Sequence, residues 1–260
     1  MTRDNLDPSL VAALVAVAGV RRLLVATDVD GTISPIVTHP ADAVVDPAAR
    51  AVLAELATQP ETSVALVSGR ALIELKAMTD LGPTILLVGS HGAEHGDYVA
   101  VSPTKALALE QVLREVRAIA DGVDGVLVEE KAMGVAVHVR RASREDAERV
   151  TAEVVAGPST RPGVRTTYGK EVVELSIADA DKGRALDRLR EETGADAVVF
   201  LGDDVTDETA FARLTPADIG IKVGPGDTAA RFRITTIDDV TTVLTTLAQA
   251  RAHPRSVSDL

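Results

Sequence analysis

Two short apolar runs, far apart in the chain, are each followed directly by acidic residues. Of all features of the sequence, these two segments constrain the fold most. The first run, Leu23–Ala26, leads to Asp28-Val29-Asp30-Gly31-Thr32. The second run, Ala197–Leu201, leads to Gly202-Asp203-Asp204-Val205-Thr206-Asp207. Short continuous apolar runs are typical of strands buried in a parallel sheet. Because sites in open α/β sheets form outside the carboxyl ends of strands, both acidic groups are expected at one edge.

From residue 21 onward, short β-rich runs alternate with helical stretches. Strands are expected at Leu23–Thr27, Ser63–Val67, Ile85–Val88, Ala197–Leu201 and Ile219–Val223. Helices are expected at Pro47–Thr58, Ala71–Thr79, Lys182–Thr193 and Asp207–Leu214. Such alternation is typical of right-handed βαβ units. It predicts an α/β fold whose core is a Rossmann-like parallel sheet covered by helices on both faces.

The segment between these two parts has a different pattern. Helices are expected at Ser102–Ala120 and Arg144–Ala156, and strand pairs at Val126–Glu129 with Val135–Arg140 and at Arg165–Thr167 with Glu171–Ile177. Antiparallel pairing is expected across Tyr168-Gly169-Lys170. The pattern predicts a second, α+β domain over residues 93–178, inserted into a core domain formed by residues 1–92 and 179–260.

Charge and composition exclude several classes of function. The chain has 27 basic and 39 acidic residues, a net charge of −12, which argues against non-specific nucleic-acid binding. The absence of cysteine excludes disulfides and thiolate metal sites. An apolar stretch at residues 10–20 is too short to span a bilayer, and Asp7-Pro8 before it is typical of a helix start. A cytoplasmic location without membrane attachment is therefore expected.

Four groups of residues fall where predicted strands end or helices begin. They are Asp28 with Asp30, then Ser68-Gly69-Arg70, then Lys182, then the acidic group from Gly202 to Glu208. Together they suit phosphoryl transfer, which needs a nucleophile, Mg²⁺ and donors to the phosphate oxygens. Carboxylate oxygens suit Mg²⁺, while a serine hydroxyl, a lysine and main-chain N–H groups near Gly31 and Gly69 suit phosphate.

Each group also has a purely structural interpretation. The first two carboxylates could form a turn, Ser68-Gly69-Arg70 could be an ordinary strand-to-helix turn, and Lys182 could be an exposed helix residue. The last group could cap a helix, with Thr206 as its N-cap. The four groups in one chain favour the chemical interpretation over these.

In this order the four groups resemble the four motifs of the haloacid dehalogenase superfamily of phosphatases, over about residues 23–240. The resemblance implies Asp28 as nucleophile, Asp30 as general acid and then base, and Lys182 as the balancing charge. Phosphate is expected at Ser68, Gly69 and Lys182. The implied Mg²⁺ residues are Asp28, Asp30 through its backbone carbonyl, Asp203 and Asp204, with Asp207 close by.

The inserted segment resembles the cap of the trehalose-6-phosphate phosphatase family in particular. The similar stretches are Gly89–Glu94, Glu129-Glu130-Lys131, His138-Val139-Arg140, and Gly169-Lys170 with Glu174. The residues expected to contact substrate are Arg70, His91, Glu94, Lys131, His138, Arg140, Lys170 and Glu174. The implied activity is Mg²⁺-dependent hydrolysis of trehalose 6-phosphate through an aspartyl-phosphate. The expected partners are a sugar phosphate and, functionally, a trehalose-6-phosphate synthase.

Two departures from that family leave the sugar open. Glu174-Leu175-Ser176-Ile177 lacks the arginine of the family's usual Glu-x-Arg-Pro, and Val139 replaces a frequent tyrosine. The alternatives are a phosphatase for sucrose 6-phosphate or a glycosyl phosphoglycerate, a mutase, or a protein without catalysis that senses a sugar phosphate or binds the synthase. The motifs alone do not separate a hydrolase from a mutase.

Overall fold

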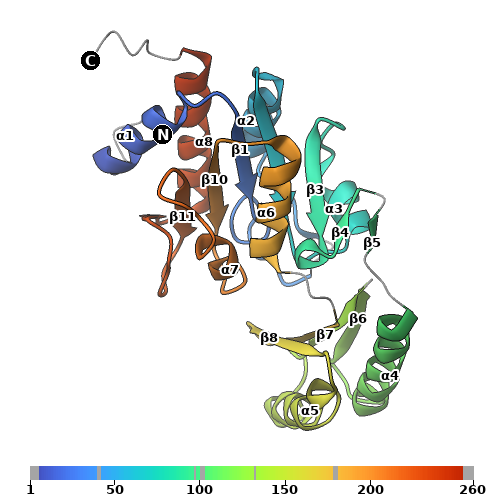
Figure 1. Ribbon diagram of the computed structural model, residues 1–260. Coiled ribbons are helices and arrows are strands. Elements are labelled where there is room, and N and C mark those ends of the chain that lie inside the picture. Colours follow the sequence, from blue (N-terminus) through green and yellow to red (C-terminus); the bar gives the residue numbers. More distant parts are fainter. Residues whose placement is uncertain are drawn as a thin grey trace. The chain divides into compact units, whose positions relative to one another are not determined.

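Two parallel strands in which every residue is buried, β1 (Leu23–Thr27) and β10 (Ala197–Gly202), lie side by side in the computed structural model (Figure 1). Their register pairs Leu23 with Ala197 and Thr27 with Leu201. The flanking parallel strands are β2 (Thr62–Val67), β3 (Ile85–Gly89), β11 (Ile219–Val223) and β12 (Phe232–Ile234). Beyond β3, β4 (Glu94–His95) runs antiparallel. The strand order is β12-β11-β10-β1-β2-β3-β4-β5, with β5 at Tyr98–Val99, so the two acidic groups follow adjacent central strands.

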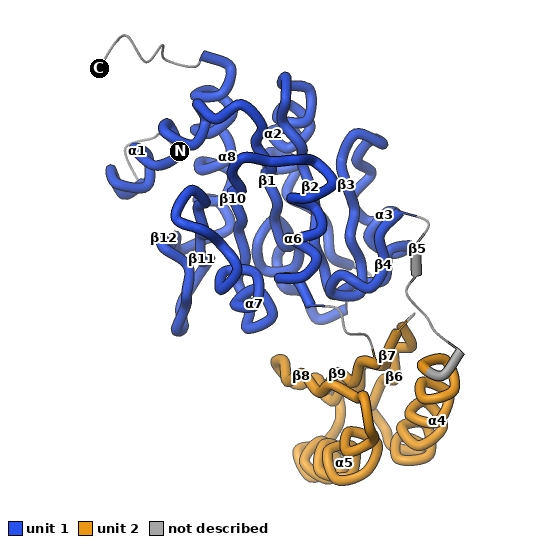
Figure 2. Tube along the Cα trace, in the orientation of Figure 1, with its two compact units in different colours: residues 1–96, 180–260 blue, residues 97–179 orange. Residues whose placement is uncertain are grey.

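The chain divides into two units, residues 1–96 with 180–260 and residues 97–179 (Figure 2). The structure describes residues 6–39, 42–96, 98–99, 103–131, 133–177 and 181–253. Ser102, the expected start of a helix, and Asp179-Ala180, before Lys182, lie outside these ranges. No helix in the described ranges has both the length and the apolar character needed to cross a bilayer.

Helices cover both faces of the parallel sheet, as predicted. Alternate residues of β1 point to opposite faces: Leu23 and Val25 belong to one apolar cluster, Leu24 and Ala26 to another. Helices that supply the first cluster are α1 (Pro8–Val17), α2 (Pro47–Thr58), α3 (Leu72–Thr79) and α8 (Ile237–Ala252). The second is covered by α6 (Lys182–Thr193) and α7 (Glu208–Phe211). The predicted α/β fold is confirmed.

Carboxylate caps set the starts of several helices. Asp7 accepts the Ser9 N–H at 2.7 Å to begin α1, and Asp46 accepts the Ala49 N–H at 2.8 Å to begin α2. Proline follows each cap at the first helical position, where its missing N–H costs nothing. The helix start predicted at Asp7-Pro8 is confirmed.

The helix expected over Asp207–Leu214 is shorter, since α7 ends at Phe211. Arg213 and Leu214 donate to carbonyls three residues back, and Pro216 follows closely, which disfavours further helix. Thr206 is not the N-cap, so that interpretation was wrong. Asp207 occupies the cap position but makes no side-chain cap bond. Helix α8 and strand β12 were not predicted.

The second unit is an antiparallel sheet with helices on one face. Its helices and strands are α4 (Pro103–Ala120), β6 (Leu127–Lys131), β7 (Gly134–His138), α5 (Arg144–Ala156), β8 (Arg165–Gly169) and β9 (Val172–Ser176). The four-stranded sheet has the order β6-β7-β9-β8. Valines of α4 and α5 pack against Val135, Val137 and Leu175. Short 3₁₀ helices lie at Ser90–Gly92 in the first unit and Pro158–Thr160 in the second.

Candidate active site

Asp28 and Lys182 form a buried ion pair at the end of β1. The Asp28 N–H donates to the Leu201 carbonyl at 2.9 Å, which fixes the main chain beside β10. Lys182 is the first residue of α6, whose start is set by Asp181 accepting the Arg184 N–H at 2.8 Å. From there its Nζ donates to Oδ1 of Asp28 at 2.6 Å. The helix start thus places an ammonium against the predicted nucleophile.

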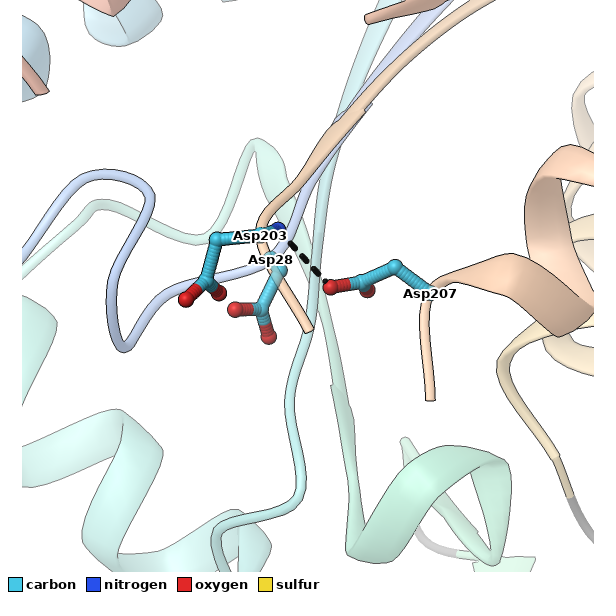
Figure 3. A group of neighbouring side chains, drawn as sticks. All are labelled: Asp28, Asp203 and Asp207. Atoms are coloured by element: carbon cyan, nitrogen blue, oxygen red, sulfur yellow. Dashed lines mark hydrogen bonds between the residues drawn. The ribbon is translucent and has the colours of Figure 1, made fainter. Parts of the chain in front are cut away.

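Asp28, Asp203 and Asp207 bring their carboxylates together (Figure 3). Among the described residues, these three offer oxygens that all lie within 4.8 Å of one another. Asp207 also shapes the loop: its Oδ2 accepts the N–H groups of Asp203 at 3.0 Å and Asp204 at 2.9 Å. Its Oδ1 accepts Nζ of Lys182 at 2.8 Å. Asp207 therefore ties the acidic loop to the same lysine that holds Asp28.

Crowding and burial change the protonation of this group. Burial raises the pKa of Asp28 well above its usual value, with Lys182 opposing and Asp207 adding to the rise. Burial and Asp207 likewise raise the pKa of Asp203 to about 6. Burial alone would lower the pKa of Lys182, but Asp207 and Asp28 together outweigh it and raise that pKa. A further positive charge would therefore be stabilised beside Asp28 and Asp203.

Gly31 lets the two acidic loops approach each other. Its φ of +90° is a conformation that favours glycine, and a Cβ there would lie 2.1 Å from Oδ2 of Asp203. The N–H of Gly31 donates to the Ser34 carbonyl at 2.7 Å, so it is engaged within its own loop. Only a residue without a side chain allows Asp203 to lie this close to the loop that carries Asp28.

The donor set fits a hard divalent cation. Carboxylate oxygens are the usual ligands of Mg²⁺, and the raised pKa values of Asp28 and Asp203 show that their charges lack full compensation. Asp207 already accepts three hydrogen bonds, from Lys182 and from two main-chain N–H groups. Asp28 and Asp203 are therefore better placed to bind a metal than Asp207.

Asp30 is held by Arg70 through two hydrogen bonds. The guanidinium donates from Nε to Oδ2 at 2.7 Å and from a terminal nitrogen to Oδ1 at 2.6 Å. This side-by-side geometry fixes both the position and the plane of the carboxylate. Arg70, predicted to contact substrate, thus orients the predicted acid/base.

Ser68 and Gly69 are fixed by the loop that follows β3. Ser68 is 1% exposed, its N–H donates to Val88, and its carbonyl accepts the His91 N–H at 2.9 Å. A Cβ on Gly69 would lie 2.6 Å from the His91 ring, so the imidazole packs on the glycine main chain. His91 itself has a φ of 54°, in the left-handed region. His91 therefore braces the predicted phosphate loop.

Glu94 is buried and holds the same region together. Its carboxylate accepts the Ser90 hydroxyl at 2.6 Å and the Leu72 N–H, at the start of α3, at 2.8 Å. These bonds connect the loop after β3 to the helix that follows Arg70. Glu94, predicted to contact substrate, here has a bracing position.

In the second unit, charged residues gather on the sheet face opposite the helices. Lys131 donates to Glu174 at 2.8 Å, and their side chains are only 10% and 17% exposed. Nε2 of His138 lies 2.7 Å from Oε2 of Glu129, a hydrogen bond that lowers the pKa of Glu129. Strand alternation puts all four on one face, since Val135, Val137 and Leu175 fill the other.

Three predicted site residues lie outside these groups. Arg140 donates to Glu171 at 3.0 Å and is exposed. Lys170 is exposed in the turn between β8 and β9. Asp204, a predicted metal residue, is exposed, and its carboxylate accepts the Val205 N–H at 2.7 Å. Their roles stay predictions.

Sequence reasoning gave Asp207 a peripheral place and missed Lys222. Asp207 is fully buried at the centre of the acidic group. Lys222 is 4% exposed and its Nζ donates to the Asp203 carbonyl at 2.6 Å. A lysine inside the apolar strand Ile219–Val223 was the available signal, because an isolated buried charge needs partners.

Comparisons with known proteins identify the family of this chain. Residues 26–236 match the family model described as trehalose-phosphatase. A trehalose-phosphate phosphatase of Mycobacterium ulcerans (strain Agy99) is 38% identical over 226 residues, 80% of this chain and 56% of that protein. A bifunctional trehalose-6-phosphate synthase/phosphatase of Thermoproteus tenax is 35% identical over 228 residues, 84% of this chain and 30% of that protein. The chain thus spans little more than half the length of the first relative.

A solved structure shows the same fold. The C-terminal domain of trehalose-6-phosphate phosphatase from C. albicans superimposes with a TM-score of 0.80 at 23% identity. The match covers 93% of this chain and 96% of that one. The arrangement of strands and helices described above is therefore shared with that domain.

Proposed function

The chain belongs to the trehalose-phosphatase family, and we propose on that premise that it hydrolyses trehalose 6-phosphate to trehalose and inorganic phosphate. One observation carries the proposal: the buried carboxylate of Asp28 lies 2.6 Å from Lys182 and beside Asp203. This arrangement offers a nucleophile, a charge that balances phosphate and a cation ligand in one place.

We propose that Asp28 attacks phosphorus. A bond forms between an Asp28 carboxylate oxygen and phosphorus, and the bond to the sugar oxygen breaks. Asp30 in its protonated form, in which one oxygen carries the proton and the other still accepts from Arg70, gives that proton to the departing sugar oxygen. Asp30 then takes a proton from water as the water oxygen attacks phosphorus, which releases phosphate and restores Asp28. Lys182 balances the charge of Asp28 and the phosphoryl group throughout.

Phosphate and metal would be held by groups already in place. The Ser68 hydroxyl, the Gly69 main chain and Lys182 would hold phosphate oxygens. Asp28, Asp203 and the Asp30 carbonyl would hold Mg²⁺, with Asp204 as a further predicted ligand. When bound, Mg²⁺ supplies positive charge that stabilises the phosphate oxygens in the transition state. The raised pKa values of Asp28 and Asp203 support a cation there.

We propose that the charged sheet face of the second unit recognises the sugar. Lys131, Glu174, His138 and Glu129 are paired with one another in the structure, and charged side chains make strong bonds to hydroxyls. Arg140 and Lys170 would contribute from the adjacent turns. Because the arginine expected after Glu174 is missing, the identity of the sugar is the first point of the proposed function to test.

A functional pairing with a trehalose-6-phosphate synthase is part of the proposal. It is supported by the Thermoproteus tenax relative, whose name joins synthase and phosphatase in one protein. A synthase would supply the phosphorylated sugar on which this chain acts. The cytoplasmic location stays a prediction.

The deciding experiment measures phosphate release from trehalose 6-phosphate, sucrose 6-phosphate and glucose 6-phosphate, with Mg²⁺ and with excess EDTA. We expect release from the trehalose ester only, lost in EDTA and restored by added Mg²⁺. One trehalose should form per phosphate, whereas a mutase would give an isomeric sugar phosphate. Release from another ester would move the substrate assignment, and no release from any ester would support a silent sensor.

A further inference from the structure

Lys222 is a buried charge in a strand that is otherwise apolar. It belongs to β11, in which all five residues are buried, and its side chain is 5% exposed. The sheet register pairs it with Gly202, the last residue of β10. An ammonium in this position loses its hydration, so it must be compensated by protein groups. The position beside Gly202 places it where the acidic loop begins.

The main compensation comes from the backbone of that loop. Nζ of Lys222 donates to the Asp203 carbonyl at 2.6 Å, and the Asp204 carbonyl lies 3.5 Å away. The N–H groups of the same two residues donate to Asp207. Asp203 is thus fixed through its N–H by Asp207 and through its carbonyl by Lys222. Its carboxylate accepts the Thr32 hydroxyl at 3.5 Å and lies beside that of Asp28.

Glu208 connects Lys222 to the next loop. Its Oε1 lies 3.6 Å from the Lys222 ammonium. Its Oε2 accepts the Ala229 N–H at 2.8 Å and the Thr228 hydroxyl at 3.3 Å. Lys222 therefore lies between the acidic loop, which it holds directly, and Glu208, which holds the segment after β11.

We infer that Lys222 is a positioning residue for the metal-binding loop: by holding the Asp203 carbonyl it directs the Asp203 carboxylate toward Asp28. This rests on the proposed function, in which these two carboxylates bind Mg²⁺. Lys222 itself touches neither substrate nor metal in this account. Residues behind metal ligands orient them, and their loss typically weakens metal affinity about 10- to 100-fold.

A second ion pair beside β10, between the buried Asp218 and the partly buried Arg190, provides a control. Asp218 accepts the Val198 N–H at 2.8 Å and pairs with Arg190 of α6. Val198 is near the start of β10, whereas Gly202, beside Lys222, is its last residue. Arg190→Met removes a cation from an ion pair, as Lys222→Met does, but far along the strand from the acidic loop. Arg190→Met therefore shows how much a loss of stability, without any change at the acidic loop, affects Mg²⁺ binding.

The test is calorimetric titration of Mg²⁺ into metal-free wild type, Lys222→Met and Arg190→Met, with circular dichroism as a check of folding. We expect the Mg²⁺ Kd to rise about 10- to 100-fold in Lys222→Met. It should stay within about twofold of wild type in Arg190→Met, because distant sites act independently. Phosphate release lost by Lys222→Met at limiting Mg²⁺ should return when Mg²⁺ is raised.

The outcomes separate this inference from the proposed function. A wild type that binds no Mg²⁺ would overturn the metal site, and the positioning role with it. Wild-type affinity in Lys222→Met, or an equal loss in Arg190→Met, would overturn the positioning role alone. Should Lys222→Met not fold, Lys222→Gln replaces it: its side chain is shorter and uncharged, so the bond to the Asp203 carbonyl weakens and the Kd should rise by more than about twofold but less than about a hundredfold. An unchanged Kd in that variant shows that the ammonium does not position Asp203 and overturns the role equally.

Discussion

Lys182 and Asp28, 154 residues apart in the sequence, form an ion pair with Nζ 2.6 Å from Oδ1, and both side chains are almost fully buried. The same ammonium donates to Asp207 at 2.8 Å. One lysine therefore serves a carboxylate from each of the two acidic loops. Removing the charge of Asp28 should abolish activity but leave the fold intact. The effects on activity and on stability can therefore be measured separately.

Asp28→Asn should reduce phosphate release by at least about a thousandfold, because an amide is a poor nucleophile toward phosphorus. The fold should survive, since burial raises the pKa of Asp28 and the folded state thus disfavours its charge. Asp187→Asn, at a partly exposed position on α6, is the matched control and should keep the wild-type rate. Residual turnover above about one per cent in Asp28→Asn would contradict the nucleophile assignment.

Arg70→Lys should lower kcat by about tenfold or more while changing KM little. A lysine keeps the charge but cannot make the two parallel bonds that fix Asp30. Arg70→Met should lower kcat further, because it removes both charge and donors. Steady-state kinetics on trehalose 6-phosphate measure both constants. A Lys variant with wild-type kcat would show that the orientation of Asp30 does not depend on Arg70.

Lys131→Met should raise KM for trehalose 6-phosphate by about tenfold, the equivalent of one charged hydrogen bond to a hydroxyl. Hydrolysis of para-nitrophenyl phosphate, which has no sugar hydroxyls, should keep its wild-type kcat/KM. Arg144→Gln, from a highly exposed pair on α5, is the control and should change neither. Equal losses on both substrates would assign Lys131 a structural role instead.

The pKa of Asp203, about 6 in the folded protein against an ordinary 3.8, predicts a pH dependence of stability. Between these values the native state binds more protons than the unfolded state, so stability falls as pH rises through this window. Asp203→Asn lacks this effect. In EDTA, the unfolding free energy of Asp203→Asn minus that of wild type should increase by about 2 kcal/mol as the pH rises from about 4 to 7.

Urea denaturation of wild type and Asp203→Asn, at several pH values, measures this difference. Taking the difference removes the contribution of other titrating groups that the two proteins share. A difference that stays constant with pH would mean that the carboxyl of Asp203 is not destabilised by burial and its neighbours.

Asp218→Asn should lower the unfolding free energy by about 3 kcal/mol. The Asp218 side chain is fully buried and accepts bonds from Val198, Thr215 and Arg190. Burial opposes the charge, but these bonds outweigh it and lower the pKa of Asp218. The bonds should therefore be lost as pH falls through that lowered pKa. Asp187→Asn, from the partly exposed pair with Arg213, should cost less than about 1 kcal/mol in the same urea experiment.

The elements that sequence predicted best are those with strong local signals. Helix α6 begins at a carboxylate cap, Asp181, and ends at Gly194, whose φ of 61° suits a helix stop. Strand β1 is five apolar or β-branched residues between charged ones. By contrast β12 is only three residues and exists through its pairing with β11, which no local pattern encodes. Helix α8 does have a local signal in the sequence, the capping box of Thr236 and Asp239.

The candidate site was predictable only as a set of loops. Adjacent parallel strands bring the ends of β1 and β10 together, so Asp28 and Asp203 were expected to be neighbours. Which side chain contacts which partner depends on the course of the loops in the folded protein, and the spacing of residues in the sequence does not predict that course. The pairing of Arg70 with Asp30 and the reach of Lys222 to a main-chain carbonyl are of this kind. Both depend on how the folded chain places these side chains.

The interrupted chain path of the first unit has a consequence for biosynthesis. Leu23 pairs with Ala197, so one edge of β1 stays unpaired until the segment that forms β10 has left the ribosome. Residues 97–179 are translated in between as one continuous stretch. Contacts between segments that are distant in sequence form slowly, and strand edges that are still unpaired can pair with other chains and aggregate. A nascent chain truncated before residue 197 therefore carries Asp28 on an unfinished sheet, without Asp203 or Asp207.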